Sequence, residues 1–200
     1  MNLLRPASRF LRRLLGRADI PDGLVIRKLR ADDLPRLFSA DLPLGETWLN
    51  SQERGEMYVA VAEVDGVAMG RSCLLYNFKG DPPNAYSFAS TVSPECQSRG
   101  IGSFLVSHNE RVARSRGMYH IAAHAAKENP RSAAWREKMG YRRMGEETIH
   151  WEGADGHHES VSWRFERAFT PPASYRIRRW IRTRMSKVRR KLLRKSQSEF

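Results

Sequence analysis

The sequence feature that most constrains the fold is the junction SPECQSRGIGSFL, which begins at Ser93. A β-rich run ends just before it at Val92, and an apolar pattern with helical spacing starts at Ile101. The junction therefore predicts a strand that leads through a short loop into a helix. Two glycines, Gly100 and Gly102, flank the helix start, where backbone N–H groups have no intrahelical acceptor. The loop is a candidate anion site, although glycines at such a junction also serve packing alone.

Strand-like and helix-like segments alternate on both sides of this junction, and no internal repeat is present. The dipeptides Asp65-Gly66 and Asp155-Gly156 favour tight turns and predict two hairpins. The order predicts one α/β domain, with helices packed on a mixed, mostly antiparallel sheet. We expect strands over residues 24–29, 57–78 (as a hairpin), 85–92, 117–126, 141–153 and 159–169, and helices over 30–40, 44–54, 101–112 and 130–140.

The positive charge of the chain is concentrated at its two ends. Residues 1–20 carry a net charge of +4 and residues 171–200 carry +10, whereas the whole chain carries +13. Residues 21–170 are therefore close to neutral and form the expected globular domain. Both ends place apolar residues on a helical stripe among Arg and Lys, so we expect a basic amphipathic N-terminal extension and a basic amphipathic C-terminal helix. This pattern favours an anionic membrane surface as a partner, with nucleic acid as a less favoured alternative and a solvated tail as the simplest one.

Two further features bear on the compartment. No apolar run reaches the ~20 residues that a membrane-spanning helix needs. The two cysteines, Cys73 and Cys96, provide no disulfide framework. We therefore expect a cytoplasmic protein, with peripheral association at the inner face of the membrane through its basic ends.

The segment VSPECQSRGIG resembles the pattern V-x-P-x-x-[QR]-x-x-G-x-[GA], the acyl-coenzyme A pyrophosphate loop of the Gcn5-related N-acetyltransferase (GNAT) family. About thirty residues further on, ENPRSAAWREKMGY resembles the second motif of that family, in which an Asn begins a helix that ends in Gly-aromatic. The resemblance covers residues 24–169 and includes the final hairpin. The positions that carry it are Val92, Pro94, Gln97, Gly100, Gly102, Asn129, Gly140 and Tyr141.

The resemblance implies a single-domain GNAT-like fold and the transfer of an acetyl or other acyl group from coenzyme A to a primary amine, without a metal. It implies that the backbone at Val92 pairs with the pantetheine arm and that Asn129 bonds the amide of the cofactor or the groups around it. The pyrophosphate would be held by a continuous run of main-chain amides. That run consists of Gln97, Ser98, Arg99, Gly100, Ile101, Gly102 and Ser103.

The sequence departs from the family pattern at the position where many members carry a Tyr that acts as the general acid. Here this position is Arg136, which cannot donate a proton at ordinary pH but could stabilise the departing thiolate or pair with a phosphate. The leaving sulfur could instead take its proton from water, Tyr141 or Tyr119. The candidate bases are His124, on the strand after the junction, and Glu46, in the region that borders the acceptor site of the family.

Several functional questions stay open in the sequence. The acceptor could be a small-molecule or a peptide amine, the acyl length depends on the depth of the pocket, and the protein could be a monomer or a homodimer. Two other functions fit the same residues. One is a non-catalytic acyl-CoA-binding regulator, which the missing Tyr favours; the other is a membrane or nucleic-acid adaptor in which the basic ends are primary.

Overall fold

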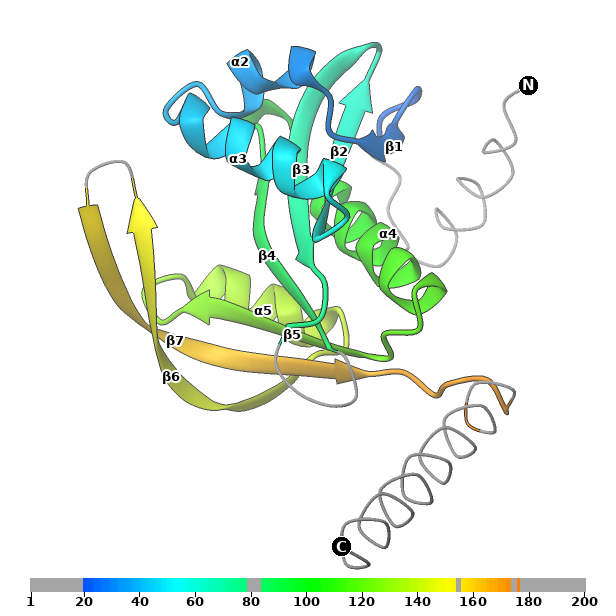
Figure 1. Ribbon diagram of the computed structural model, residues 1–200, viewed down its shortest axis with the longest axis vertical. Helices are drawn as coiled ribbons and strands as arrows, with labels where there is room; N and C mark the ends of the chain where they lie inside the picture. Colours follow the sequence, from blue (N-terminus) through cyan, green and yellow to red (C-terminus); the bar gives the residue numbers. More distant parts are fainter. Residues whose placement is uncertain (1–19, 79–83, 154–155, 174–175, 177–200) are drawn as a thin grey trace, which may run out of the picture. The chain divides into compact units, whose positions relative to one another are not determined.

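The computed structural model describes residues 20–78, 84–153, 156–173 and 176 (Figure 1). The two basic extensions lie almost wholly outside these residues, so their helical structure and their partners stay predictions. Among the described residues, no helix is long and apolar enough to cross a membrane. The elements are β1 Val25–Lys28, α2 Leu34–Leu37, α3 Leu42–Glu53, β2 Met57–Val64, β3 Val67–Leu75, β4 Ala85–Val92, α4 Ile101–Ser115, β5 His120–Ala126, α5 Pro130–Lys138, β6 Arg142–Gly153 and β7 Gly156–Ala168, with short 3-10 turns at Ala31–Asp33 and Pro94–Cys96.

This order of elements confirms the prediction from the sequence, including the hairpin at Asp65-Gly66. Both of those turn residues have positive φ angles, +50° and +82°, as a tight two-residue hairpin turn requires. Several boundaries differ. The first helix is shorter than expected, at Leu34–Leu37, and the helix expected to end at residue 112 continues to Ser115. The strand expected from residue 117 begins at His120. Gly117 has a φ angle of +80° and belongs to the turn that closes α4.

The described residues form one seven-stranded sheet with the order β1-β2-β3-β4-β5-β7-β6. All neighbouring strands are antiparallel except β4 and β5, which are parallel. The expected mixed, mostly antiparallel sheet is therefore confirmed. The parallel pair is in the middle of the sheet, directly before and after α4 in the chain, so the strand-to-helix junction lies at the centre of the fold.

Two apolar clusters cover the opposite faces of the sheet. On one face, α2 and α3 pack on alternate residues of β2 and β3, around Phe38, Val59 and Cys73. On the other face, α4 packs on the intervening residues, around Ala60 and Leu105. Because successive strand residues point to opposite faces, the nearly continuous apolar run of β2 supplies both clusters.

The parallel pair β4 and β5 separates soon after it begins. The two strands pair only from Ala85 to Ser87 of β4, and their later residues do not pair with each other. The β3–β4 register also shifts near this point, and Ala89 has a φ angle of +46°, which is strained for a residue with a Cβ. A bulge of this kind bends its strand and breaks the pairing. The strands therefore diverge, and a gap opens between them in the middle of the sheet.

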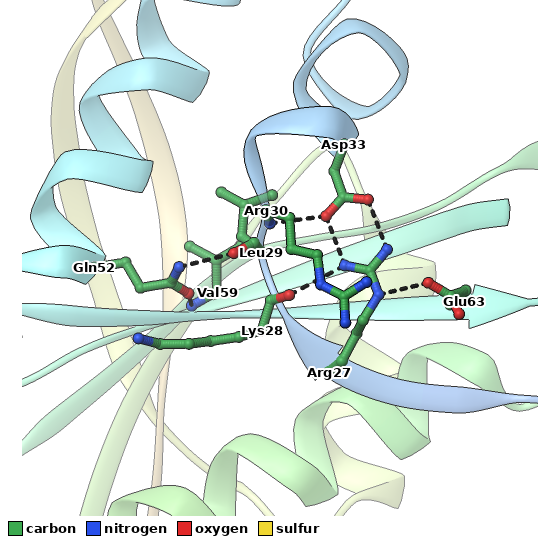
Figure 2. A network of polar contacts seen from close by, with 8 residues as sticks. All are labelled: Arg27, Lys28, Leu29, Arg30, Asp33, Gln52, Val59 and Glu63. Atoms are coloured by element: carbon green, nitrogen blue, oxygen red, sulfur yellow. Dashed lines mark hydrogen bonds and ion pairs between the residues drawn. The ribbon is translucent and has the colours of Figure 1, made fainter. Parts of the chain in front are cut away.

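Polar side chains fix α2 and α3 to the edge of the sheet (Figure 2). The Arg27 guanidinium donates two hydrogen bonds of 2.7 Å to the Asp33 carboxylate and one of 2.5 Å to Glu63. The buried Gln52 amide of α3 donates to the Leu29 carbonyl at 3.1 Å and accepts from the Val59 N–H at 3.2 Å. This amide satisfies backbone groups next to the end of β1, so α3 is held in one position against β2.

Candidate active site

The gap between β4 and β5 contains a pocket of about 270 Å³. Phe88 and Tyr86 line it from β4, and His124 lines it from β5. Trp135 and Arg136 of α5 close another side. Phe88 packs with the cluster under α2 and α3. The preceding residue, Ser87, points to the opposite face of the sheet, where Arg136 donates a hydrogen bond to it. The pocket is therefore bordered by side chains from both faces of the sheet.

The loop before α4 has the backbone geometry of an anion site. Gly100 has a φ angle of +86° at the N-cap of α4, a conformation that strongly favours glycine. A Cβ at Gly102 would lie 3.6 Å from Trp135 and 3.9 Å from Val92, so the missing side chain leaves a space between strand and helix. The N–H groups of Ile101, Gly102 and Ser103 open the helix, where no preceding turn provides carbonyl acceptors. These features fit a phosphate-bearing ligand.

Side chains tie this loop to its surroundings. Arg131 donates to the Ser98 hydroxyl at 2.8 Å, and the Trp135 indole N–H donates to the Ser103 hydroxyl at 3.0 Å. Both bonds link the loop to α5, so loop and helix form one wall. The Gln97 amide donates to the Val92 carbonyl at 3.1 Å and closes the loop onto the end of β4. The sequence did not single out Arg131 or Trp135, because the contact joins two segments about thirty residues apart.

Arg99 and Asn129 were also expected at the cofactor. Arg99 is exposed on the loop. The Asn129 side chain accepts a hydrogen bond of 2.9 Å from the Ser132 N–H, so it caps the N-terminus of α5. Its position at the helix start agrees with the expected motif, and the cap explains locally why α5 begins there.

Arg136 is a buried cation in the wall of the pocket. Only 2% of the residue is exposed, and its guanidinium donates to the Ser87 hydroxyl at 3.3 Å. Its Nε has no hydrogen-bond partner, and no described carboxylate bonds the guanidinium. Burial lowers the pKa of Arg136 from its usual range. A buried cation of this kind is costly unless an anion joins it, so the site suits a ligand that carries or develops negative charge.

A chain of polar side chains crosses the other side of the pocket. The Tyr86 hydroxyl lies 2.9 Å from His124 Nδ1, and His124 Nε2 lies 3.1 Å from the Glu147 carboxylate. An ionised carboxylate only accepts hydrogen bonds, so Nε2 carries the proton and Nδ1 is left to accept from the Tyr86 hydroxyl. The His124 side chain is only 8% exposed. Burial raises the pKa of Tyr86 to about 12, so this tyrosine is held in its protonated form.

The structure places the other two candidate catalytic residues outside the pocket lining. Glu46 is exposed on α3. Tyr141 is buried, its ring 5.3 Å from the Arg136 guanidinium, and burial raises its pKa. Tyr86 and Glu147, by contrast, were missed by sequence reasoning. Tyr86 lies in β4, which contains no carboxylate and so offered no candidate base in the sequence. Glu147 belongs to β6, which is separated from β5 by β7 in the sheet.

Among the described residues, no group of three His, Cys, Asp or Glu side chains could hold a metal ion. The adjacent His157 and His158 lie at the start of β7, in the terminal hairpin. The chemistry that the pocket offers is thus that of a buried cation, a backbone anion loop and a Tyr–His–Glu chain.

The split parallel strands, the loop and the helix that follows it define an acetyltransferase domain. A profile of the acetyltransferase (GNAT) family matches residues 25–141, and the chain belongs to this family. A search of curated proteins gave no match.

Solved structures agree with this assignment of the fold. A ribosomal-protein-alanine N-acetyltransferase from Brucella melitensis is 20% identical, with a TM-score of 0.60 over 72% of this chain and 99% of that one. A putative acetyltransferase from Salmonella typhimurium, solved with its cofactor acetyl-CoA, is 16% identical, with a TM-score of 0.61 over 76% and 99%. A spermidine N-acetyltransferase chimera derived from Vibrio cholerae is 16% identical, with a TM-score of 0.58 over 74% and 96%. At these identities the likeness is one of fold.

Proposed function

We propose that this protein is an N-acyltransferase that moves an acetyl group, or another acyl group, from coenzyme A to a primary amine. The observation that carries the proposal is the pocket between β4 and β5. A Tyr–His–Glu chain borders it on one side, and on the other side its wall residue Trp135 bonds Ser103 of the glycine loop. The neighbour that contains acetyl-CoA supports the choice of acyl donor.

The loop from Gln97 to Ser103 would hold the pyrophosphate of the acyl donor through main-chain N–H groups and the positive end of α4. From this loop the pantetheine arm would pass along β4 into the pocket. The backbone of β4 is unpaired on its β5 side beyond Ser87, so it offers hydrogen bonds to that arm. Asn129 would contribute mainly by fixing the start of α5.

The transfer requires a proton acceptor for the amine. In this proposal the amine nitrogen bonds to the thioester carbon, and its proton moves to the Tyr86 oxygen while the Tyr86 proton moves to His124 Nδ1. Glu147 holds the His124 ring in the tautomer that can accept this proton, and it stabilises the imidazolium that forms. His124 is therefore the base, and Tyr86 connects it to the acceptor.

The C–S bond then breaks and the sulfur leaves as a thiolate. Arg136 is buried in the pocket wall with no described carboxylate partner, so its charge would stabilise the thiolate without giving up a proton. A thiol has a pKa of only about 8.5, so the leaving group needs no strong acid. This accounts for an enzyme that has Arg where related proteins carry Tyr, and it leaves Tyr141 to pack against the guanidinium.

A thiol-release assay with acetyl-CoA and a panel of amines tests the proposal. The wild-type protein should release free thiol with at least one amine class. Arg136→Met should lower kcat about 100-fold, because one buried donor to developing charge contributes about that factor. Arg142→Met, an exposed substitution on β6, is the matched control and should leave kcat within about twofold. Tight binding of coenzyme A without thiol release for any amine would instead show the non-catalytic regulator.

A further inference from the structure

We propose that the pocket has an anion-binding subsite at Arg71 and that the acceptor is therefore an amine that also carries a carboxylate. This inference rests on the proposed function and names the substrate class of the same site. The observations behind it concern the face of the sheet under α2 and α3, opposite to the face from which the loop before α4 approaches.

Arg71 of β3 is a half-buried cation that packs on aromatic rings. Its guanidinium lies 3.8 Å from the Phe38 ring centroid and 5.4 Å from that of Trp48. Among the described residues, no carboxylate pairs with Arg71, and its buried Nε has no hydrogen-bond partner. Arg27, another largely buried arginine, instead contacts both Asp33 and Glu63. Burial lowers the pKa of Arg71 from its usual range.

An aromatic row connects Arg71 to the pocket. Phe38 contacts Trp48 edge to face at 5.2 Å, Trp48 contacts Phe88 at 5.4 Å, and Phe88 stacks on Tyr86 at 5.4 Å. Phe88 and Tyr86 line the pocket, and Tyr86 bonds His124. Trp48 and Arg71 do not line the pocket themselves, so a ligand would reach Arg71 by extending from the pocket past the Phe88 and Trp48 rings.

The row is held in place by its supporting helices. Gln52 fixes α3, which carries Trp48, to the backbone of β1 and β2 (Figure 2). Gly45 of α3 packs so closely on α2 that a Cβ there would lie only 2.7 Å from the Phe38 ring. The Arg71 side chain thus stacks on an aromatic surface whose position is fixed before any ligand binds. Pre-organisation of this kind lowers the entropic cost of binding.

The chemistry of Arg71 selects the class of ligand. A guanidinium stacked on a ring keeps its planar edge of N–H donors, which matches the two oxygens of a carboxylate. A neighbouring cation repels polyamines, so the acceptor class differs from that named for the spermidine N-acetyltransferase chimera. Apolar carbons between the amine and the carboxylate would pack on Trp48 and Phe88.

Linear ω-amino acids of increasing length test this subsite. Each acid is compared with its carboxamide, which has the same amine but no negative charge. Wild-type protein with saturating acetyl-CoA should turn over the best acid at least tenfold better than its amide in kcat/KM. Arg71→Gln should raise KM for that acid about tenfold and leave the amide within about twofold. Arg71→Lys should keep part of the preference, because it keeps the charge but loses the two-point contact. Arg54→Gln, an exposed arginine paired with Glu56, is the matched control and should change neither.

Equal turnover of acid and amide by the wild-type protein would overturn the inference, as would an equal loss of both in Arg71→Gln. If no amine of any kind releases thiol, the proposed function fails, and the subsite is then judged by binding. Calorimetry with coenzyme A-loaded protein would compare 3-phenylpropionate with 3-phenylpropanamide. Binding of the acid alone, lost in Arg71→Gln, supports the subsite; equal or absent binding of the two probes overturns it.

Discussion

In the described part of the chain, one tyrosine–histidine pair lies at the pocket and another lies in the packing between β2 and α4. The Tyr86 hydroxyl lies 2.9 Å from His124 Nδ1, and the Tyr58 hydroxyl lies 3.0 Å from His108 Nε2. Both rings of each pair also contact one another, the first at 61° and the second at 25°. The two pairs therefore have nearly equal distances, although the rings meet edge to face in the first pair and are stacked in the second.

The pairs differ in what the second ring nitrogen of each histidine contacts. Glu147 accepts from His124, whereas no described carboxylate bonds His108. Burial lowers the pKa of His108 to about 4, and the nearby positive charge of Arg111 adds to this effect. His108 is thus neutral at physiological pH and serves packing. Both histidines have a tyrosine partner, so this partner does not distinguish the candidate base. His124 differs because it also bonds the Glu147 carboxylate and lines the pocket.

The largest expected effect is the loss of turnover on removal of the pocket histidine. His124→Ala should lower kcat about 1000-fold with little change in KM for acetyl-CoA, since a positioned base contributes about 10²–10⁴-fold. The thiol-release assay measures it. His108→Ala is the matched control and should lower thermal stability while leaving kcat of the folded protein within about threefold. Equal losses of kcat in the two variants would remove the distinction between the pairs.

The next effect concerns the carboxylate that separates the pairs. Glu147→Gln should lower kcat about tenfold to a hundredfold, because an amide can donate to His124 and so no longer fixes the productive tautomer. Glu146→Gln, one residue earlier and paired with the surface residue Lys127, is the control and should be neutral. A Glu147→Gln enzyme with full turnover would show that the carboxylate is structural and that the base lies elsewhere.

The pairs also show what the sequence could and could not predict. The loop from Gln97 to Ser103 is contiguous, so its glycines and its place before a helix were visible in the sequence. The Tyr86–His124–Glu147 chain joins three strands, and its geometry depends on the parallel register of β4 with β5 and on the order in which β7 precedes β6 in the sheet. Strand order and register are set by long-range pairing, which residue patterns do not encode locally. His124 could be proposed from the sequence, but neither of its partners could.

The aromatic row under α3 follows the same rule. Trp48, Phe88 and Arg71 come from three elements, and each alone is an ordinary core or surface residue. Only the packing of α3 against β3 and β4 brings the cation onto the rings. The strained Ala89 was equally hidden, because alanine carries no turn preference that predicts a positive φ angle. Sites built by tertiary packing need the structure, whereas sites built by a loop can be found from its residues.

The smallest expected effect is a pH dependence of stability that belongs to the packed pair alone. His108 has a pKa of about 4 in the folded protein, against about 6.5 for an unfolded histidine. Its contribution to stability is therefore fully present above pH 6.5 and is lost as the pH falls toward 4, because the unfolded chain binds the proton first.

Since the ring is only partly buried, we expect a loss of about 2 kcal/mol in the free energy of unfolding. Urea denaturation between pH 7 and 4 measures it, with His108→Gln as the comparison, since Gln keeps an acceptor for Tyr58 but does not titrate. The difference between the two stability curves should shrink over this range; a constant difference would mean that His108 titrates normally and that the second pair is not held by burial.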